Sequence, residues 1–169
     1  MGEHTQAYMV EAVRKFLDGK LNGDKWHYTT HADIAFKGNI SGLTSKISNV
    51  DFCIVVDDDA VTCFHTMPFS VPEELRPAVS EFITRANYKL AKGCFAMDYS
   101  DGSLCYKMNV SAWDILSGDD RATLHNMQML LMLGANMCDR YGDNLLALLF
   151  DSAEKQNIAA LVKQCEPQE

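Results

Sequence analysis

The chain has 169 residues and a mass of 18.9 kDa, and 47% of its side chains are apolar, which suits a single domain with its own core. Fifteen Lys and Arg against 23 Asp and Glu give a formal net charge of -8. Because this sign repels a phosphate backbone, we expect no nucleic-acid partner. The apolar run at residues 129–135 is far shorter than the roughly 20 residues that cross a bilayer, and no apolar leader occurs near residue 1. We therefore expect a soluble, cytoplasmic protein without a membrane partner.

The first half of the chain predicts a helix followed by strands. Apolar side chains recur at helical spacing within residues 6–18, and short alternating stretches with turn signals indicate strands and loops within residues 25–46. Residues 50–56 and 60–67 are rich in β-branched and aromatic side chains. The three aspartates at 57–59 between them predict a three-residue turn, and hence a β-hairpin.

Six cysteines occur, and none lies in a C-x-x-C spacing. In a reducing compartment they act as small apolar side chains. The three-residue turn would place Cys53 opposite Cys63, so a disulfide between them is the alternative. His27 and His31 are four residues apart without an evident third ligand, and we expect neither a metal nor a cofactor.

The middle of the chain predicts a central helix. Ser70 and Glu73 have the spacing of a capping box, apolar residues repeat on one face from Leu75 to Leu90, and Gly93 provides a stop. Pro77 lacks an N–H, so the helix either bends there or begins later than the capping box suggests. Asn87 lies at the margin of the apolar face, where its amide is expected to tie the helix to a neighbouring strand or loop.

Asp101 and Gly102 form a type I′ turn pair between two alternating segments. A two-residue loop would pair residue 99 with 104 and residue 95 with 108. The buried face of this second hairpin would then consist of Phe95, Met97, Tyr99, Leu104, Tyr106 and Met108.

Two helices are expected to complete the chain. Ser117 and Asp120 can cap a long helix that runs to about Arg140, and Tyr141 with Gly142 would end it. A last helical stretch covers residues 143–163, interrupted or bent near 151–152. Since strands do not alternate one by one with helices, we predict an α+β fold, a single domain with a mostly antiparallel sheet and flanking helices.

The long helix is apolar beyond the stripe that a core requires. Met129, Met132 and Leu133 project on the side that also carries Asn136. Two interpretations remain open for these residues. The C-terminal helix covers them, or they form a surface for a homodimer or a protein partner, for which flexible methionines are suited.

The sequence gives little indication of catalytic chemistry. No G-x-S-x-G, P-loop or G-x-G-x-x-G motif occurs, so an enzyme is not expected. In the register of a three-residue turn His65 would face Asp51, which predicts a cross-strand pair rather than a general base.

The segment from Glu81 to Lys107 resembles the YbjN-like bacterial family, and the resemblance extends over roughly residues 70–163. The pattern consists of Arg85-Ala86-Asn87-Tyr88, Gly93-x-Phe95-x-Met97-Asp98, Asp101-Gly102, Tyr106-Lys107 and Asp139-Arg140-Tyr141. The resemblance implies a fold similar to that of type III secretion chaperones, which commonly dimerise and bind segments of other proteins. It implies no reaction, cofactor or catalytic residue.

Two hypotheses follow. The first is a non-enzymatic, chaperone-like or regulatory protein that binds a protein partner of unknown identity, with a homodimer as a further possibility. The second is a small-molecule sensor or an enzyme without a linear motif, with a pocket near the 51–67 hairpin at His65 and the Asp57 turn.

Overall fold

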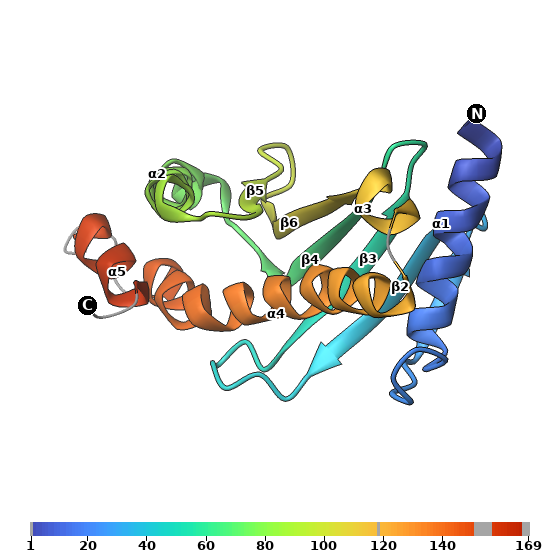
Figure 1. Cartoon of the computed structure of the whole chain (residues 1–169). Helices are drawn as coiled ribbons and strands as arrows, with labels where there is room; N and C mark the ends of the chain where they lie inside the picture. Colours follow the sequence, from blue (N-terminus) through green and yellow to red (C-terminus); the bar gives the residue numbers. More distant parts are fainter. Residues whose placement is uncertain (1, 118, 151–156, 167–169) are drawn as a thin grey trace.

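The computed structural model describes residues 2–117, 119–150 and 157–166 (Figure 1). Its helices and strands follow the predicted order, except that a short helix at residues 112–116, which the sequence did not predict, precedes the long helix. In chain order they are α1 (Gly2–Leu17), β1 (Tyr28–His31), β2 (Ala35–Ser41), β3 (Asn49–Val56), β4 (Ala60–Ser70), the 3-10 helix η1 (Glu73–Leu75), α2 (Arg76–Lys89), β5 (Cys94–Met97), β6 (Ser103–Ser111), α3 (Ala112–Leu116), α4 (Asp120–Phe150) and α5 (Ile158–Cys165).

All six strands pair antiparallel in one sheet with the order β1-β2-β3-β4-β6-β5. Helices α1, α2 and α4 lie on one face of this sheet (Figure 1). Alternate strand residues, such as Phe52, Cys63 and Tyr106, are buried beneath them, because successive side chains of a strand point to opposite faces. On the opposite face Lys37 and Lys107 are exposed. The predicted α+β class with a mostly antiparallel sheet is therefore confirmed.

The first hairpin has a register that the sequence did not predict. The backbone N–H of Asp57 donates to the carbonyl of Ala60 at 2.9 Å, and Val56 pairs with Val61. The turn is thus one residue longer than predicted, which moves each partner by one position. Cys63 faces Ile54 and not Cys53, so the predicted juxtaposition of the two cysteines is wrong. All six cysteines are free thiols.

Helix α2 begins later than the capping box suggests. Ser70 is the last residue of β4, and Pro72 precedes the short helix η1 without a side-chain cap. Regular α-helix starts at Arg76, with Pro77 in its first turn, where a missing N–H costs no hydrogen bond. The predicted capping box is wrong, and the alternative of a later start is confirmed.

The amide of Asn87 joins the end of α2 to strand β5. Its Nδ2 donates to the carbonyl of Phe95 at 2.9 Å, and its Oδ1 accepts from the N–H of Phe95 at 2.8 Å. The side chain therefore satisfies both polar backbone groups of Phe95, as a neighbouring strand would. Gly93 lies between these two residues, immediately before β5, with a φ of +66°.

The second hairpin also differs from its predicted register. Phe95 pairs with Tyr106, and the N–H of Gly102 donates to the carbonyl of Asp98 at 2.8 Å, which closes a wider turn than type I′. The left-handed conformation is adopted by Gly102 (φ +77°) but not by Asp101. A type I′ turn needs it at both positions. A slip of two residues keeps the buried face unchanged, but it leaves Tyr99 in the turn, 55% exposed.

Helix α4 does not end at Tyr141 and Gly142, as predicted, but continues to Phe150 and has 31 residues in all. Gly142 is tolerated inside it because Ser45 and Ile47 pack closely there. Its N-terminus is capped by Asp119, whose Oδ1 accepts from the N–H of Ala122 at 2.9 Å. Ser117 instead closes α3. The predicted break near 151–152 lies outside the described residues.

Candidate functional site

The four residues proposed from the sequence lie on the flank of α4 that points away from the sheet. Met132 is 40% exposed and Asn136 is exposed, while Met129 and Leu133 are partly buried. We call these four residues the α4 surface. Helix α5 packs further along, where Asn144 Nδ2 lies 3.0 Å from Cys165 Sγ. Met132 thus keeps its exposure with α5 in place.

A groove of about 580 Å³ adjoins this surface between the end of α2, the middle of α4 and the end of α5. We call it the α2–α4 groove. Its apolar lining consists of Leu90, Ala91, Tyr106, Leu133, Met137 and Tyr141. Its charged lining consists of Lys89, Lys92, Arg140 and Glu166. Leu133 belongs to both the α4 surface and the groove.

Aromatic side chains pack against one another beneath the groove and form its floor. The ring of Phe95 lies 5.0 Å from that of Tyr106 and 5.1 Å from that of Tyr141, both in edge-to-face geometry. The hydroxyl of Tyr106 donates to the carbonyl of Lys92. Burial raises the pKa of Tyr106 to about 12, so the phenol keeps its proton at neutral pH.

The rim of the groove is basic in an acidic protein. Lys89 Nζ lies 2.7 Å from Glu166 Oε2, and the guanidinium Nε of Arg140 donates to the carbonyl of Cys165. Lys92 is exposed, and in the described part of the chain no carboxylate lies within ion-pair distance of it. Within the part of the chain that the structure describes, three cations and one carboxylate therefore surround an apolar floor.

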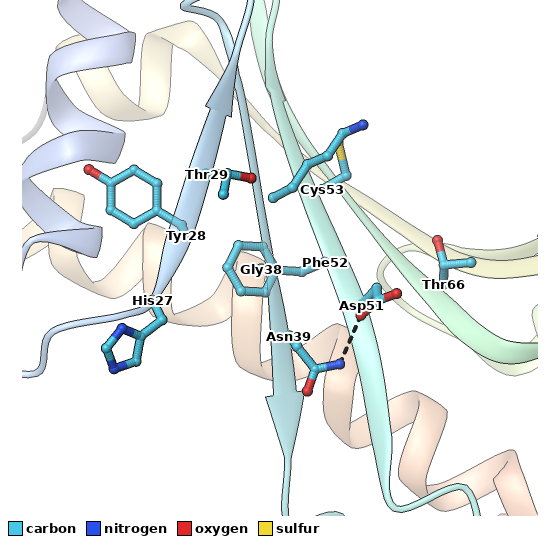
Figure 2. A pocket seen from close by; sticks show the side chains of 10 residues that line it. His27, Tyr28, Thr29, Gly38, Asn39, Asp51, Phe52, Cys53 and Thr66 are labelled. Atoms are coloured by element: carbon cyan, nitrogen blue, oxygen red, sulfur yellow. Dashed lines mark hydrogen bonds between the residues drawn. The ribbon is translucent and has the colours of Figure 1, made fainter.

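A second pocket of about 760 Å³ lies on the open face of the sheet, over strands β1 to β4 (Figure 2). The 51–67 hairpin contributes Asp51, Phe52, Cys53 and Thr66 to its lining. The pocket thus lies at the predicted hairpin, but neither His65 nor the Asp57 turn takes part in its lining. Asn39 Nδ2 donates to Asp51 Oδ1 at 2.8 Å within it (Figure 2).

The chemistry of this open-face pocket does not favour a nucleophile. Burial raises the pKa of the Cys53 thiol, and the nearby Lys37 lowers it less. A catalytic cysteine needs the opposite shift, because the thiolate is the reactive form. His27 lies just before β1 and His31 at its end, and among the described residues no group of three His, Cys, Asp or Glu is placed to hold a metal ion.

His65 is buried where α4 crosses β4, and it does not face Asp51. Its cross-strand neighbour in β3 is Phe52. Its Nε2 lies 2.7 Å from the carbonyl oxygen of Leu131, while its Nδ1 has no hydrogen-bond partner. The predicted pair with Asp51 is wrong because the turn is one residue longer. The imidazole instead attaches the long helix to the centre of the sheet.

Acid is expected to destabilise the protein through this histidine. Burial lowers the pKa of His65 below its usual 6.5, so under acidic conditions the unfolded chain binds a proton that the folded protein does not. The free energy of unfolding should therefore fall as pH drops from about 7 through 6.5, by up to about 1.4 kcal/mol per pH unit for one proton. Urea unfolding between pH 7 and 5 measures this slope. His65→Gln should reduce it, whereas His31→Gln, at an exposed position, should not. Equal slopes in both variants would contradict the assignment.

These features define an α+β protein in which the described helices cover one face of a single antiparallel sheet and leave the other face open. The chain belongs to the YbjN family. The family model, described as "Putative bacterial sensory transduction regulator", matches residues 21–147, from the end of the α1 region into α4. That description is consistent with a regulatory role. No curated protein and no solved structure matches the chain. In the described residues, no helix is both long and apolar enough to span a bilayer.

Proposed function

We propose that this protein is a non-enzymatic regulator that acts in a chaperone-like manner, by binding a segment of a partner protein through the α4 surface. Two facts support the proposal. The family is described as one of regulators, and no linear catalytic motif occurs in the sequence. The regulatory role rests on the family, and the binding mode rests on the geometry of α4.

The observation that carries the binding mode is the exposure of Met132. Helix α4 buries a full stripe of apolar residues against the sheet, and Met132 stands on its opposite side, 40% exposed. Met129 and Leu133 continue the apolar area toward the α2–α4 groove. Exposed apolar area next to a concave surface is typical of sites where a partner side chain is buried. Asn136, which is exposed beside it, supplies hydrogen bonds at the rim.

The test compares two charge-introducing variants of α4. Met132→Glu places a carboxylate at the centre of the surface, whereas Gln128→Glu introduces the same side chain one turn earlier at an exposed position. A partner is first isolated by affinity capture from a lysate of the source bacterium and then purified, and its affinity for each variant is measured by titration.

The expected result is at least a tenfold loss of affinity for Met132→Glu and no change for Gln128→Glu, because a buried, unpaired carboxylate costs about 1.4 kcal/mol or more. Light scattering on the purified protein shows whether the surface instead joins two copies of the chain. Unchanged affinity in folded Met132→Glu would remove the α4 surface from the proposal, and a Met132-dependent dimer without a partner would replace the partner by a second copy.

The open-face pocket favours a second candidate function, that of a small-molecule sensor. Its volume of about 760 Å³ lies in the range of small-ligand sites, which is about 300–1,000 Å³. Its lining of His27, Lys37, Asn39 and Asp51 suits a polar metabolite. A thermal-shift screen of polar metabolites with wild type and Asp51→Asn tests this candidate. Stabilisation of the wild type only would support it, and no stabilisation of either would reject it.

A further inference from the structure

We infer that the α2–α4 groove binds a small monocarboxylate with an apolar body, such as a medium-chain fatty acid. This groove is a different site from the open-face pocket. Ligand binding in the groove does not depend on the proposed partner protein. The inference rests on the shape of the groove, its lining and the sign of its charges.

The shape suits a small ligand. Three elements that are distant in sequence enclose the groove: the end of α2 with residues 90–92, the middle of α4, and Glu166 after α5. Its volume of about 580 Å³ lies within the range of small-molecule sites. An extended protein segment would instead need a long, open channel or a free sheet edge.

The lining provides two separate zones. Leu133 and Met137 lie one turn apart on α4, and Leu90 with the ring of Tyr141 completes an apolar wall. Because methionine is flexible, such a wall can adapt to chains of different length. An apolar body placed there would be removed from water, which contributes about 0.8 kcal/mol for each buried methylene group.

The charges select an anion. Among the described residues, the groove is lined by the cations Lys89, Lys92 and Arg140 and by one carboxylate, that of Glu166, although the whole chain has a net charge of -8. Glu166 is engaged by Lys89 at 2.7 Å, and the guanidinium of Arg140 is held in place by the carbonyl of Cys165. Lys92 is exposed at the rim, next to the apolar wall. A ligand carboxylate can therefore reach Lys92 and Arg140 while its apolar body contacts Leu133 and Met137.

Calorimetry with decanoate tests the inference on the purified chain. Decanoate is expected to bind saturably, acetate is expected not to bind because it lacks the apolar body, and octanol is expected to bind at least tenfold more weakly than octanoate because it lacks the charge. Binding of octanoate, but not of octanol, should weaken as salt is raised. Equal affinity for octanoate and octanol would overturn the role of the basic rim, and no binding of decanoate would overturn the inference.

Two charge reversals locate the site. Lys92→Glu is expected to weaken decanoate binding at least tenfold, whereas Lys25→Glu, an equal change at an exposed position before β1, should leave it unchanged. Both positions are exposed, so both variants should remain folded. Equal affinity in the two variants would place decanoate elsewhere and contradict the inference.

Leu133 links this site to the α4 surface. A ligand against Leu133 would change the apolar area that is offered to a partner, which is how a regulator could respond to a metabolite. This step rests on the proposed function, whereas decanoate binding is measured without a partner. If the chain does not bind decanoate, the ligand site is therefore rejected, while the proposal that the α4 surface binds a partner is unaffected.

Discussion

Replacing Gly134 by alanine is expected to lower the free energy of unfolding by about 2–3 kcal/mol. A Cβ at this position would lie 2.1 Å from Nδ1 and 2.2 Å from Cε1 of His65, which is fully buried beneath α4. In an exposed helix the same change would stabilise by about 1 kcal/mol. The close contact is expected to make the substitution destabilising, because the imidazole is fully buried and is held by the carbonyl of Leu131. Urea unfolding followed by circular dichroism measures the change.

Two further variants separate the contact from other effects of the substitution. Gly142→Ala, in the same helix, would place its Cβ 3.0 Å from Ser45 Oγ and 3.1 Å from Ile47, so a smaller loss is expected. In a His65→Ala background, Gly134→Ala should cost at least 1 kcal/mol less than in the wild type, because the ring is absent. A stabilising effect of Gly134→Ala in the wild type would show that α4 does not approach β4 as closely as described.

Replacing Asn87 by alanine is expected to destabilise the protein by about 2–3 kcal/mol. The change removes two hydrogen bonds at once and leaves both the N–H and the carbonyl of Phe95 without a partner. Phe95 is buried, so water cannot replace the amide without cost. The free energy of unfolding, measured by urea titration, tests this expectation.

The matched control is Asn126→Ala. This asparagine donates one exposed bond of 3.2 Å to the carbonyl of Asp114, and its loss should cost less than about 1 kcal/mol. Equal costs for the two asparagines would contradict the role of Asn87 as a substitute strand. Since Phe95 contacts Tyr106 and Tyr141, Asn87→Ala should also weaken decanoate binding.

Local patterns predicted most of the elements, though not the short helix α3 or the registers of the two hairpins. Alternation identifies a strand and its buried face, whereas register depends on the number of turn residues and on what packs against them. In the first hairpin a turn longer by one residue moved His65 away from Asp51. In the second hairpin, a Cβ on Gly102 would lie only 2.1 Å from the carbonyl oxygen of Val71. Contacts with the chain before α2 therefore help to shape this turn.

The end of the long helix was predicted wrongly for a similar reason. Glycine after a run of helical residues usually marks a C-terminus. Here the loop before β3 packs against the helix at Gly142, and its backbone donates to two aspartates of α4. The N–H of Ser45 donates to Asp139 at 2.7 Å, and the N–H of Lys46 donates to Asp143 at 2.8 Å. These partners are almost 100 residues away in the chain, and no local pattern indicates them.

Of the candidate sites too, one could be predicted from local sequence and another could not. The apolar excess at residues 129–133 is a local property of one helix, and the sequence was enough to propose it. The α2–α4 groove combines Lys92, Tyr106 and Arg140 with Glu166, which only the fold brings together. One signal was present, because Leu133, Met137 and Arg140 share the spacing of one helix flank.

Site-specific photo-crosslinking on α4 tests the central claim, that the α4 surface binds a partner protein. The photoreactive residue p-benzoylphenylalanine would replace Met132 in one version of the chain and Gln128 in another, and both would be irradiated in the source bacterium. We expect position 132 to give one discrete crosslinked product with a second protein. This product should be much weaker from position 128 and should be lost when Leu133→Glu is added. Equal products from both positions, or none from position 132 in a folded chain, would contradict it.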